Sequence, residues 1–300
     1  MKFPNLIVIG AAKAGTSAFY RYIEQHPQIY TSSIKEPQFF GLEGETKQFK
    51  GPPGMEIKEN KAIRTMEEYQ ALFKDAPEDR CIVEASTSYL YLPKASERIH
   101  HYIPQVKLIA ILRNPVERAY SAFLYLTRDG REPITDFSKA LLAEPTRIQN
   151  DWAFLYRYQD FGFYSSQLKR YYDKFDSTQL RIFLHDDLKA DPLKVMRETF
   201  SFLNLDSTFE PDMSRRFNVS GLPKNKLLHK LIGEQNMLKS VFKSVLPRKY
   251  RSDLKERYYE KNLSKPRLAE ETRLQLIETF REDILKTQDL IGRDLSAWLK

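Results

Sequence analysis

The residues that most constrain the fold lie at the start of the chain, where a strand runs through a tight turn into a helix. Residues 6–9 are apolar and rich in β-branched side chains, which predicts a buried strand. Residues 18–25 have helical character, and Gly10 and Gly15 lie in the turn between the two elements. A strand, a tight turn and a helix in this order direct backbone N–H groups at a phosphate. The sequence therefore predicts an α/β fold with an anion site at its first turn.

The position of one lysine separates this turn from the loop of nucleoside triphosphatases. A Walker A loop reads G-x-x-x-x-G-K-[ST]. Here Gly10 and Gly15 keep that spacing, but Thr16 and Ser17 follow directly and Lys13 lies inside the loop. A charge at that place is closer to the bridging oxygen of a diphosphate-like group than to a γ-phosphate and its Mg²⁺.

Four short apolar runs predict the strands of a sheet, near residues 5–10, 80–85, 106–112 and 179–184. Helical patterns lie between them, which favours a parallel sheet with helices on both faces. Ligands of such sheets bind beyond the carboxyl ends of the strands. Arg113 follows the third run directly, so we expect it at the same edge of the sheet as the first turn.

Several segments resemble motifs of the sulfotransferases that use 3′-phosphoadenosine 5′-phosphosulfate (PAPS). The turn A-K-A-G-T-S at 12–17 is similar to their 5′-phosphosulfate loop, and R-N-P-V-E-R-A-Y-S at 113–121 is similar to their 3′-phosphate motif. K-E-P-Q-F-F at 35–40 resembles a segment of the heparan-sulfate-type and bacterial members. The resemblance runs from about residue 3 to the C-terminus. It implies a P-loop-NTPase-like sulfotransferase fold in which 1–300 form a single domain.

The resemblance also implies roles for residues. Lys13 would neutralise the leaving phosphate, and Glu36 would be the general base, with Glu84 as a weaker competitor for that role. Ala85 and Gln38 stand where some relatives carry a substrate-facing lysine and a histidine, which argues against a polyanionic, heparan-like acceptor. The residues expected to bind the cofactor are Lys13, Ala14, Gly15, Thr16, Ser17, Arg113, Ser121 and Lys224. His185 stands where the family pattern has a tyrosine beside the adenine, and its role is open.

Three segments fall outside these motifs. We assign the connections 41–65 and 129–160 to binding of a small-molecule or carbohydrate acceptor, because loops over a rigid sheet usually carry specificity. Residues 211–260 hold twelve Lys and Arg against five Asp and Glu, and much of the net charge of +8 lies there. PAPS is an anion, so a basic segment covering the cofactor is the simplest interpretation. A solvated face is the alternative. Residues 227–246 show helical spacing with a basic opposite face, which predicts a helix packed on its own domain, with binding to a membrane or a partner as the alternative.

Composition restricts the other function classes. The single cysteine, Cys81, allows no intrachain disulfide, which fits a reducing compartment. No apolar stretch approaches eighteen residues, so we expect no transmembrane helix and a cytoplasmic enzyme. The five histidines and one cysteine form no metal-spaced cluster, so no metal is expected. Nucleic-acid binding lacks a recognisable motif.

Two other functions remain open from the residues alone. A P-loop kinase or NTPase would need a lysine directly after Gly15 and a metal-binding aspartate after a later strand. A non-catalytic nucleotide-binding or membrane-associated protein would use the basic segment 211–260. This function would not explain why Lys13 and Glu36 occur together.

Overall fold

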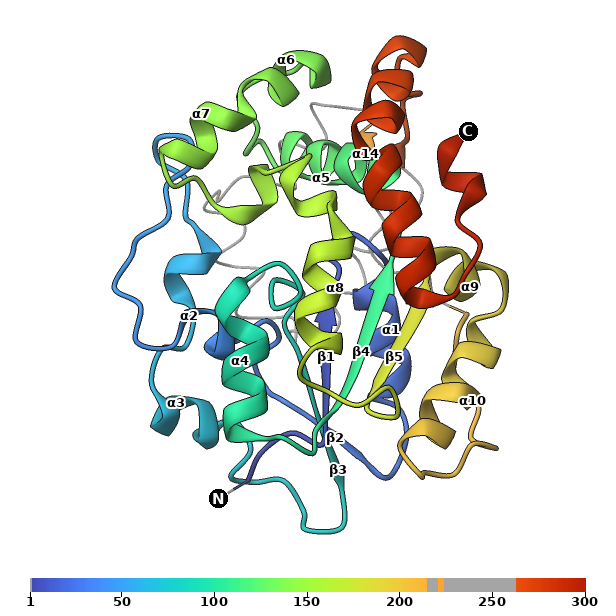
Figure 1. Ribbon diagram of the computed structural model, residues 1–300. Coiled ribbons are helices and arrows are strands. Elements are labelled where there is room, and N and C mark those ends of the chain that lie inside the picture. The colour runs from blue at the N-terminus through green and yellow to red at the C-terminus, as the bar shows by residue number, and fades with distance from the viewer. Residues whose placement is uncertain (1, 215–220, 224–262) are drawn as a thin grey trace.

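A five-stranded parallel sheet lies at the centre of the protein (Figure 1). The computed structural model describes residues 2–214, 221–223 and 263–300. The strand order is β2-β3-β1-β4-β5. The strands are β1 Leu6–Gly10, β2 Ile29–Thr31, β3 Cys81–Ala85, β4 Lys107–Leu112 and β5 Leu180–Leu184. All four predicted strands are present within one residue of the expected bounds, and the α/β architecture is confirmed.

The sheet is buried on both faces, which explains the uninterrupted apolar runs. Val8 of β1 pairs with Ala85 of β3 and with Ile109 of β4 in parallel register. Residues 6–9 and 108–112 have no solvent-exposed surface. Parallel strands of this kind are covered by helices and lose the polar alternation of a half-exposed strand. The edge strand β2 was not predicted, because its three residues are too few to show a period.

Helices cover the sheet on both faces. In Figure 1, α4 and α8 lie in front of the sheet and α1 lies behind it. The longer helices are α1 Thr16–Ile23, α4 Pro93–Tyr102, α5 Pro115–Arg128, α8 Tyr164–Tyr172, α10 Pro192–Phe202 and α14 Glu270–Ile291. The shorter ones are α2 Phe39–Leu42, α3 Met66–Ala71, α6 Phe137–Leu142, α7 Glu144–Gln149 and α9 His185–Ala190. The 3₁₀ turns are η1 Lys58–Lys61, η2 Phe154–Tyr156, η3 Asp160–Gly162 and η4 Ser296–Leu299. A short antiparallel pair joins β6 Leu222–Pro223 to β7 Leu263–Ser264.

The C-terminal segment folds back on the domain. Helix α14 and the turn η4 form it, and Trp298 is 4% exposed with its ring 6.3 Å from that of Tyr164. None of the helices described here is long and apolar enough to cross a bilayer. Lys224 lies outside the described residues, as do most of 211–260 and all of 227–246.

Candidate active site

The first turn has the backbone geometry that its glycines predict. Lys13 and Gly15 adopt left-handed conformations, with φ of 70° and 93°. A Cβ atom at Gly15 would lie 3.2 Å from side-chain carbons of both His185 and Leu188. Glycine is therefore needed at this position for its conformation and for the close packing of β1 and α1 against α9.

Helix α1 begins with an open N-terminus. Gly15 is its N-cap residue and offers no side chain to cap the helix, and the first turn contains no acidic residue. The first amide groups of a helix have no intrahelical acceptor. Together with the positive end of the helix dipole, they form a binding site for an anion. By contrast, Asn114 caps α5 by accepting hydrogen bonds from the amides of Val116 and Glu117 at 3.0 and 3.4 Å.

Lys13 lies over an aromatic ring in a positively charged environment. Its Nζ atom is 4.0 Å from the centre of the Tyr125 ring, and the guanidinium of Arg128 is 4.9 Å from the same ring. Burial, followed by repulsion from Arg128 and Arg113, lowers the pKa of the Lys13 ammonium to about 7. An anionic group that entered the turn would relieve this repulsion and hold the lysine protonated.

Arg113 reaches the turn from the neighbouring strand. It follows the end of β4, and its Nη1 atom donates to the backbone oxygen of Lys13 at 3.0 Å. Its own backbone oxygen accepts a hydrogen bond from the Tyr164 hydroxyl at 3.0 Å. The structure thus brings together the two motifs that lie one hundred residues apart in the chain.

The remaining predicted cofactor residues differ in their surroundings. Ala14 and Thr16 are buried in the turn, whereas Ser17 is half-buried. Ser17 accepts a hydrogen bond from the Nζ atom of Lys35 at 2.7 Å. Ser121 lies on α5 and is fully buried. Their binding roles stay predictions.

Glu36 is held by the tip of the adjacent strand β3. Its φ of 61° is left-handed, and its amide donates to the backbone oxygen of Ala85 at 3.0 Å. The carboxylate accepts hydrogen bonds from the amide and the hydroxyl of Thr87, at 2.7 and 3.0 Å. Thr87 therefore fixes the orientation of the half-buried carboxylate. Glu36 lies outside both predicted cofactor motifs.

Glu84, the competing base, lies in the interior of the protein. It is fully buried on β3 and accepts a hydrogen bond from the Tyr69 hydroxyl at 3.3 Å. Burial raises the pKa of Glu84 to about 8. A carboxyl group with no exposed surface cannot meet an acceptor directly, so the geometry favours Glu36 for that role.

His185 lies against the first turn from the end of β5. Its side chain is 27% exposed, and it would contact a Cβ atom at Gly15. Burial and the nearby charge of Arg113 lower the pKa of His185, which keeps the imidazole neutral at physiological pH. A neutral, half-buried ring at this place can contact a flat ligand beside the turn.

The sequence did not single out several residues of this site. Lys35, Tyr125, Arg128 and Thr87 were assigned no role. The helical spacing of Ser121, Tyr125 and Arg128 could have placed Tyr125 and Arg128 on the same face of α5 as the predicted cofactor residue Ser121. The contact of Lys35 with Ser17 could not be predicted from sequence spacing, because it depends on the conformation of the loop after β2.

The two predicted acceptor segments pack against each other. Lys50 and Trp152 are paired in an isolated β-bridge, and the rings of Phe49 and Phe154 lie 4.6 Å apart. A cavity of about 520 Å³ lies between the segments and is lined by Met55 and Trp152, among others. The segments 41–65 and 129–160 are therefore in contact, and their acceptor role stays a prediction.

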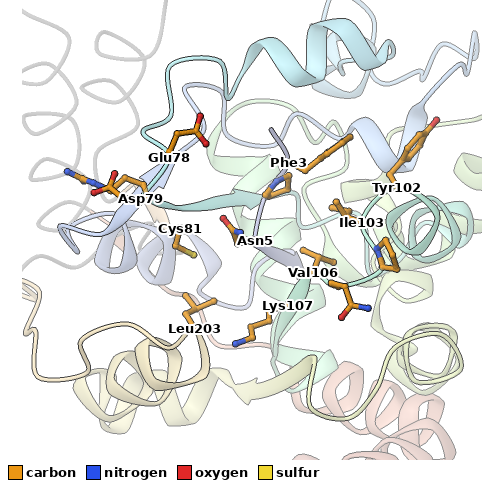
Figure 2. Close-up of a pocket in the computed structure, with 14 residues that line it drawn as sticks. Phe3, Asn5, Glu78, Asp79, Cys81, Tyr102, Ile103, Val106, Lys107 and Leu203 are labelled. Atoms are coloured by element: carbon orange, nitrogen blue, oxygen red, sulfur yellow. The ribbon is translucent and has the colours of Figure 1, made fainter. Parts of the chain in front are cut away.

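A larger cavity lies at the opposite end of the sheet (Figure 2). It measures about 620 Å³ and is lined by Asn5, Cys81 and Lys107, which lie at or just before the first residues of β1, β3 and β4. The site described above lies at the last residues of the same strands. This cavity is thus separate from the first turn and from Glu36.

Metal binding has no support within the described part of the chain. No three His, Cys, Asp or Glu side chains in it lie together as a ligand set. The expectation of a metal-free site nevertheless stays a prediction.

Comparison with known proteins places the fold and the motifs in one family. The sequence model of the sulfotransferase domain matches residues 3–262. A solved sulfotransferase from Alicyclobacillus acidocaldarius is 30% identical, with a TM-score of 0.78 and complete coverage of both chains. The bifunctional heparan sulfate N-deacetylase/N-sulfotransferase 1 of Mus musculus is 26% identical over the whole of this chain and 31% of its own length. The corresponding protein 3 of Homo sapiens is 28% identical over 68% of this chain and 22% of its own length. The chain thus spans less than a third of the curated relatives it matches.

Proposed function

Because the chain belongs to the sulfotransferase domain family, we propose that it transfers a sulfuryl group from PAPS to a hydroxyl or amine of a carbohydrate or small metabolite. The observation that carries the proposal is the contact of Arg113 with the backbone of Lys13, which joins two cationic groups at one uncapped helix start. Their amide, ammonium and guanidinium donors are the groups that bind phosphates in proteins.

In this proposal the strand tips hold the two ends of one nucleotide. The amides of Ala14 and Gly15, with Thr16 and Ser17, bind the 5′-phosphate at the start of α1. Arg113 binds the 3′-phosphate, with Ser121 and Lys224 as further ligands. Lys224 and the basic segment 211–260 cover the cofactor in this proposal. We also propose that the enzyme is cytoplasmic.

Lys13 and Glu36 carry the chemistry in this proposal. The acceptor oxygen or nitrogen attacks sulfur in line with the departing phosphate oxygen, and the bond between sulfur and that oxygen breaks. Lys13 neutralises the negative charge that grows on the leaving oxygen. Glu36, oriented by Thr87, takes the proton of the acceptor. Transfer of this kind depends mainly on positioning and electrostatics, which a fixed strand-tip geometry provides.

The relatives guide the choice of acceptor. Their names describe heparan sulfate N-sulfotransferases, which supports transfer to a sugar amine or hydroxyl. The alternative of a P-loop kinase or NTPase is disfavoured by Thr16, which occupies the position of the Walker A lysine.

Thermal shift separates these two functions. We expect adenosine 3′,5′-bisphosphate (PAP) to raise the melting temperature, and ATP with Mg²⁺ to raise it less or not at all. Mass spectrometry of host extracts incubated with PAPS then identifies sulfated products that form only with active protein. Stabilisation by ATP with Mg²⁺ alone would remove the sulfotransferase proposal.

A further inference from the structure

A carboxylate lies in the middle of the predicted 3′-phosphate motif. Arg113 directly precedes α5, and Glu117 and Ser121 lie in this helix. Glu117 and Ser121 are four residues apart and therefore share one face of α5. The Oε2 atom of Glu117 lies 3.8 Å from Nη2 of Arg113. A carboxylate at this place would repel a phosphate, so its charge has to be offset by other groups.

Two cations from the C-terminal part of the chain offset the charge of Glu117. Lys265 donates from Nζ to Glu117 Oε2 at 2.6 Å, and Arg273 donates from Nη2 to Oε1. Burial disfavours the ionised carboxylate, but these two hydrogen bonds outweigh it and lower the pKa of Glu117 to about 2. Together with Arg113, three cations surround one carboxylate, which leaves the cluster with a charge of +2.

The fold fixes the backbone next to both cations. Ser264, directly before Lys265, belongs to β7, which pairs with β6. Thr272, directly before Arg273, is 5% exposed, and its hydroxyl lies 2.7 Å from that of Ser138. Helix α14 packs beside α5 (Figure 1). The two cations are therefore brought to α5 by the packing of their own segments and not by Glu117 alone.

The distances allow one phosphate to reach cations of both segments. Arg113 Nη2 and Lys265 Nζ lie 3.8 and 2.6 Å from the same Glu117 oxygen, so they are at most about 6.4 Å apart, the sum of the two distances. A phosphate that accepts hydrogen bonds of about 2.8 Å on two of its oxygens can bridge this separation. At 3.8 Å, Nη2 of Arg113 is beyond hydrogen-bond distance from Glu117 and can donate to a ligand. The side chains of Arg113, Lys265 and Arg273 are 14%, 40% and 26% exposed, so a dissolved ligand can meet them.

We infer that Lys265 and Arg273 bind the 3′-phosphate of the nucleotide together with Arg113. A phosphate monoester carries a charge of about −2 above neutral pH, which matches the excess charge of the cluster. Both residues lie beyond residue 262, where the match to the sulfotransferase domain ends, and no motif of the sequence assigns them a role. Glu117 holds the cations together when no nucleotide is bound, and it opposes the phosphate when one is. This assignment rests on the proposed sulfotransferase function.

Two nucleotides that differ only in the 3′-phosphate test the inference. Isothermal titration calorimetry at pH 8 measures the Kd of PAP and of adenosine 5′-phosphate for the wild type, Lys265→Met, Arg273→Met and Glu117→Gln. Each cation variant leaves Glu117 with one hydrogen-bonded partner, and thermal melting shows that the variants are folded. Lys286→Met and Arg281→Met are the matched controls, because these residues of α14 form ion pairs with exposed glutamates of the same helix.

We expect Lys265→Met and Arg273→Met each to weaken PAP by about tenfold and adenosine 5′-phosphate by less than about twofold. Glu117→Gln should bind PAP at least about threefold more tightly, because it removes an anion beside the phosphate. Both controls should keep both Kd values within about twofold of wild type. A purely structural role of the ion pairs gives the opposite sign for Glu117→Gln, since loss of the shared partner would displace the cations and weaken PAP.

The other outcomes separate the inference from the function on which it rests. Affinities that stay unchanged in Lys265→Met and Arg273→Met, or that fall equally for the two nucleotides, would overturn the inference. Weaker binding of PAP by folded Glu117→Gln would overturn it as well. In each of these cases tight binding of PAP by the wild type leaves the transferase function standing. A wild type that binds neither nucleotide would remove the proposed function itself.

Discussion

The pKa of Lys13 predicts that the proposed binding of PAP depends on pH in a defined direction. In the free protein this pKa is lowered to about 7, so the ammonium is half neutral at pH 7 and almost wholly neutral at pH 9. A phosphate beside it favours the charged form, so binding must supply the missing proton. Affinity therefore falls as pH rises through and above 7, and it levels off below 7.

The size of the effect follows from the same pKa. The apparent Kd scales with 1 + 10^(pH − 7) while Lys13 remains protonated in the complex, which gives about a 50-fold weakening between pH 7 and pH 9. Proton uptake on binding should rise from about 0.5 at pH 7 to about 1 at pH 9. Above pH 7 the phosphate groups of the ligand are almost fully ionised, so they add little to this slope.

Isothermal titration calorimetry in buffers of different ionisation enthalpy measures both quantities. Lys13→Arg keeps its charge at every pH and should bind PAP without this slope. Lys13→Ala measures the contribution of other groups to the pH dependence of PAP binding. Glu84 is the main candidate, because its pKa of about 8 lies between pH 7 and pH 9. A wild-type Kd that stays constant from pH 7 to 9, without proton uptake, would show that Lys13 does not contact the nucleotide.

Three further changes test the rest of the site and the frame around it. Glu36→Gln should lower kcat by about 100-fold or more and leave the Kd for PAP within about twofold, because Thr87 and not the cofactor turn holds this carboxylate; steady-state kinetics with normal turnover would remove the assigned base. Arg113→Ala should weaken PAP by at least about tenfold and adenosine 5′-phosphate much less, and an equal loss for both in calorimetry would contradict its 3′-phosphate role. In the wild type the Arg147 guanidinium donates to both carboxylate oxygens of the buried Glu132, at 2.7 and 2.8 Å, and Arg147→Met removes this ion pair. The free energy of unfolding in urea should fall by about 3–5 kcal/mol, and a loss below about 1 kcal/mol would show that the pair is dispensable.

The sheet and the first turn could be predicted because their residues act locally. An apolar run buried on both faces and two glycines at a fixed spacing leave few alternatives for residues 6–15. The meeting of Arg113 with Lys13 followed from topology, since both come after neighbouring parallel strands.

Other parts of the site depend on contacts that no local pattern encodes. Lys265 and Arg273 meet Glu117 only because the last part of the chain packs on α5, and no spacing in the sequence indicates these contacts. The hold of Thr87 on Glu36 joins residues fifty-one positions apart, and it requires an unusual positive φ at Glu36. Strand β2 was missed for a related reason, because pairing with β3 and not its own pattern defines it.

In the strand order β3-β1-β4, the candidate base and the candidate 3′-phosphate ligand lie on opposite sides of β1. Glu36 is tied to β3 through Ala85 and Thr87, whereas Arg113 extends from β4 on the other side of the first turn. Between Glu36 and the start of β3, the chain can lengthen or change without moving any group that we propose to bind the nucleotide. A lineage built on this frame could exchange one acceptor for another while its donor chemistry stayed the same.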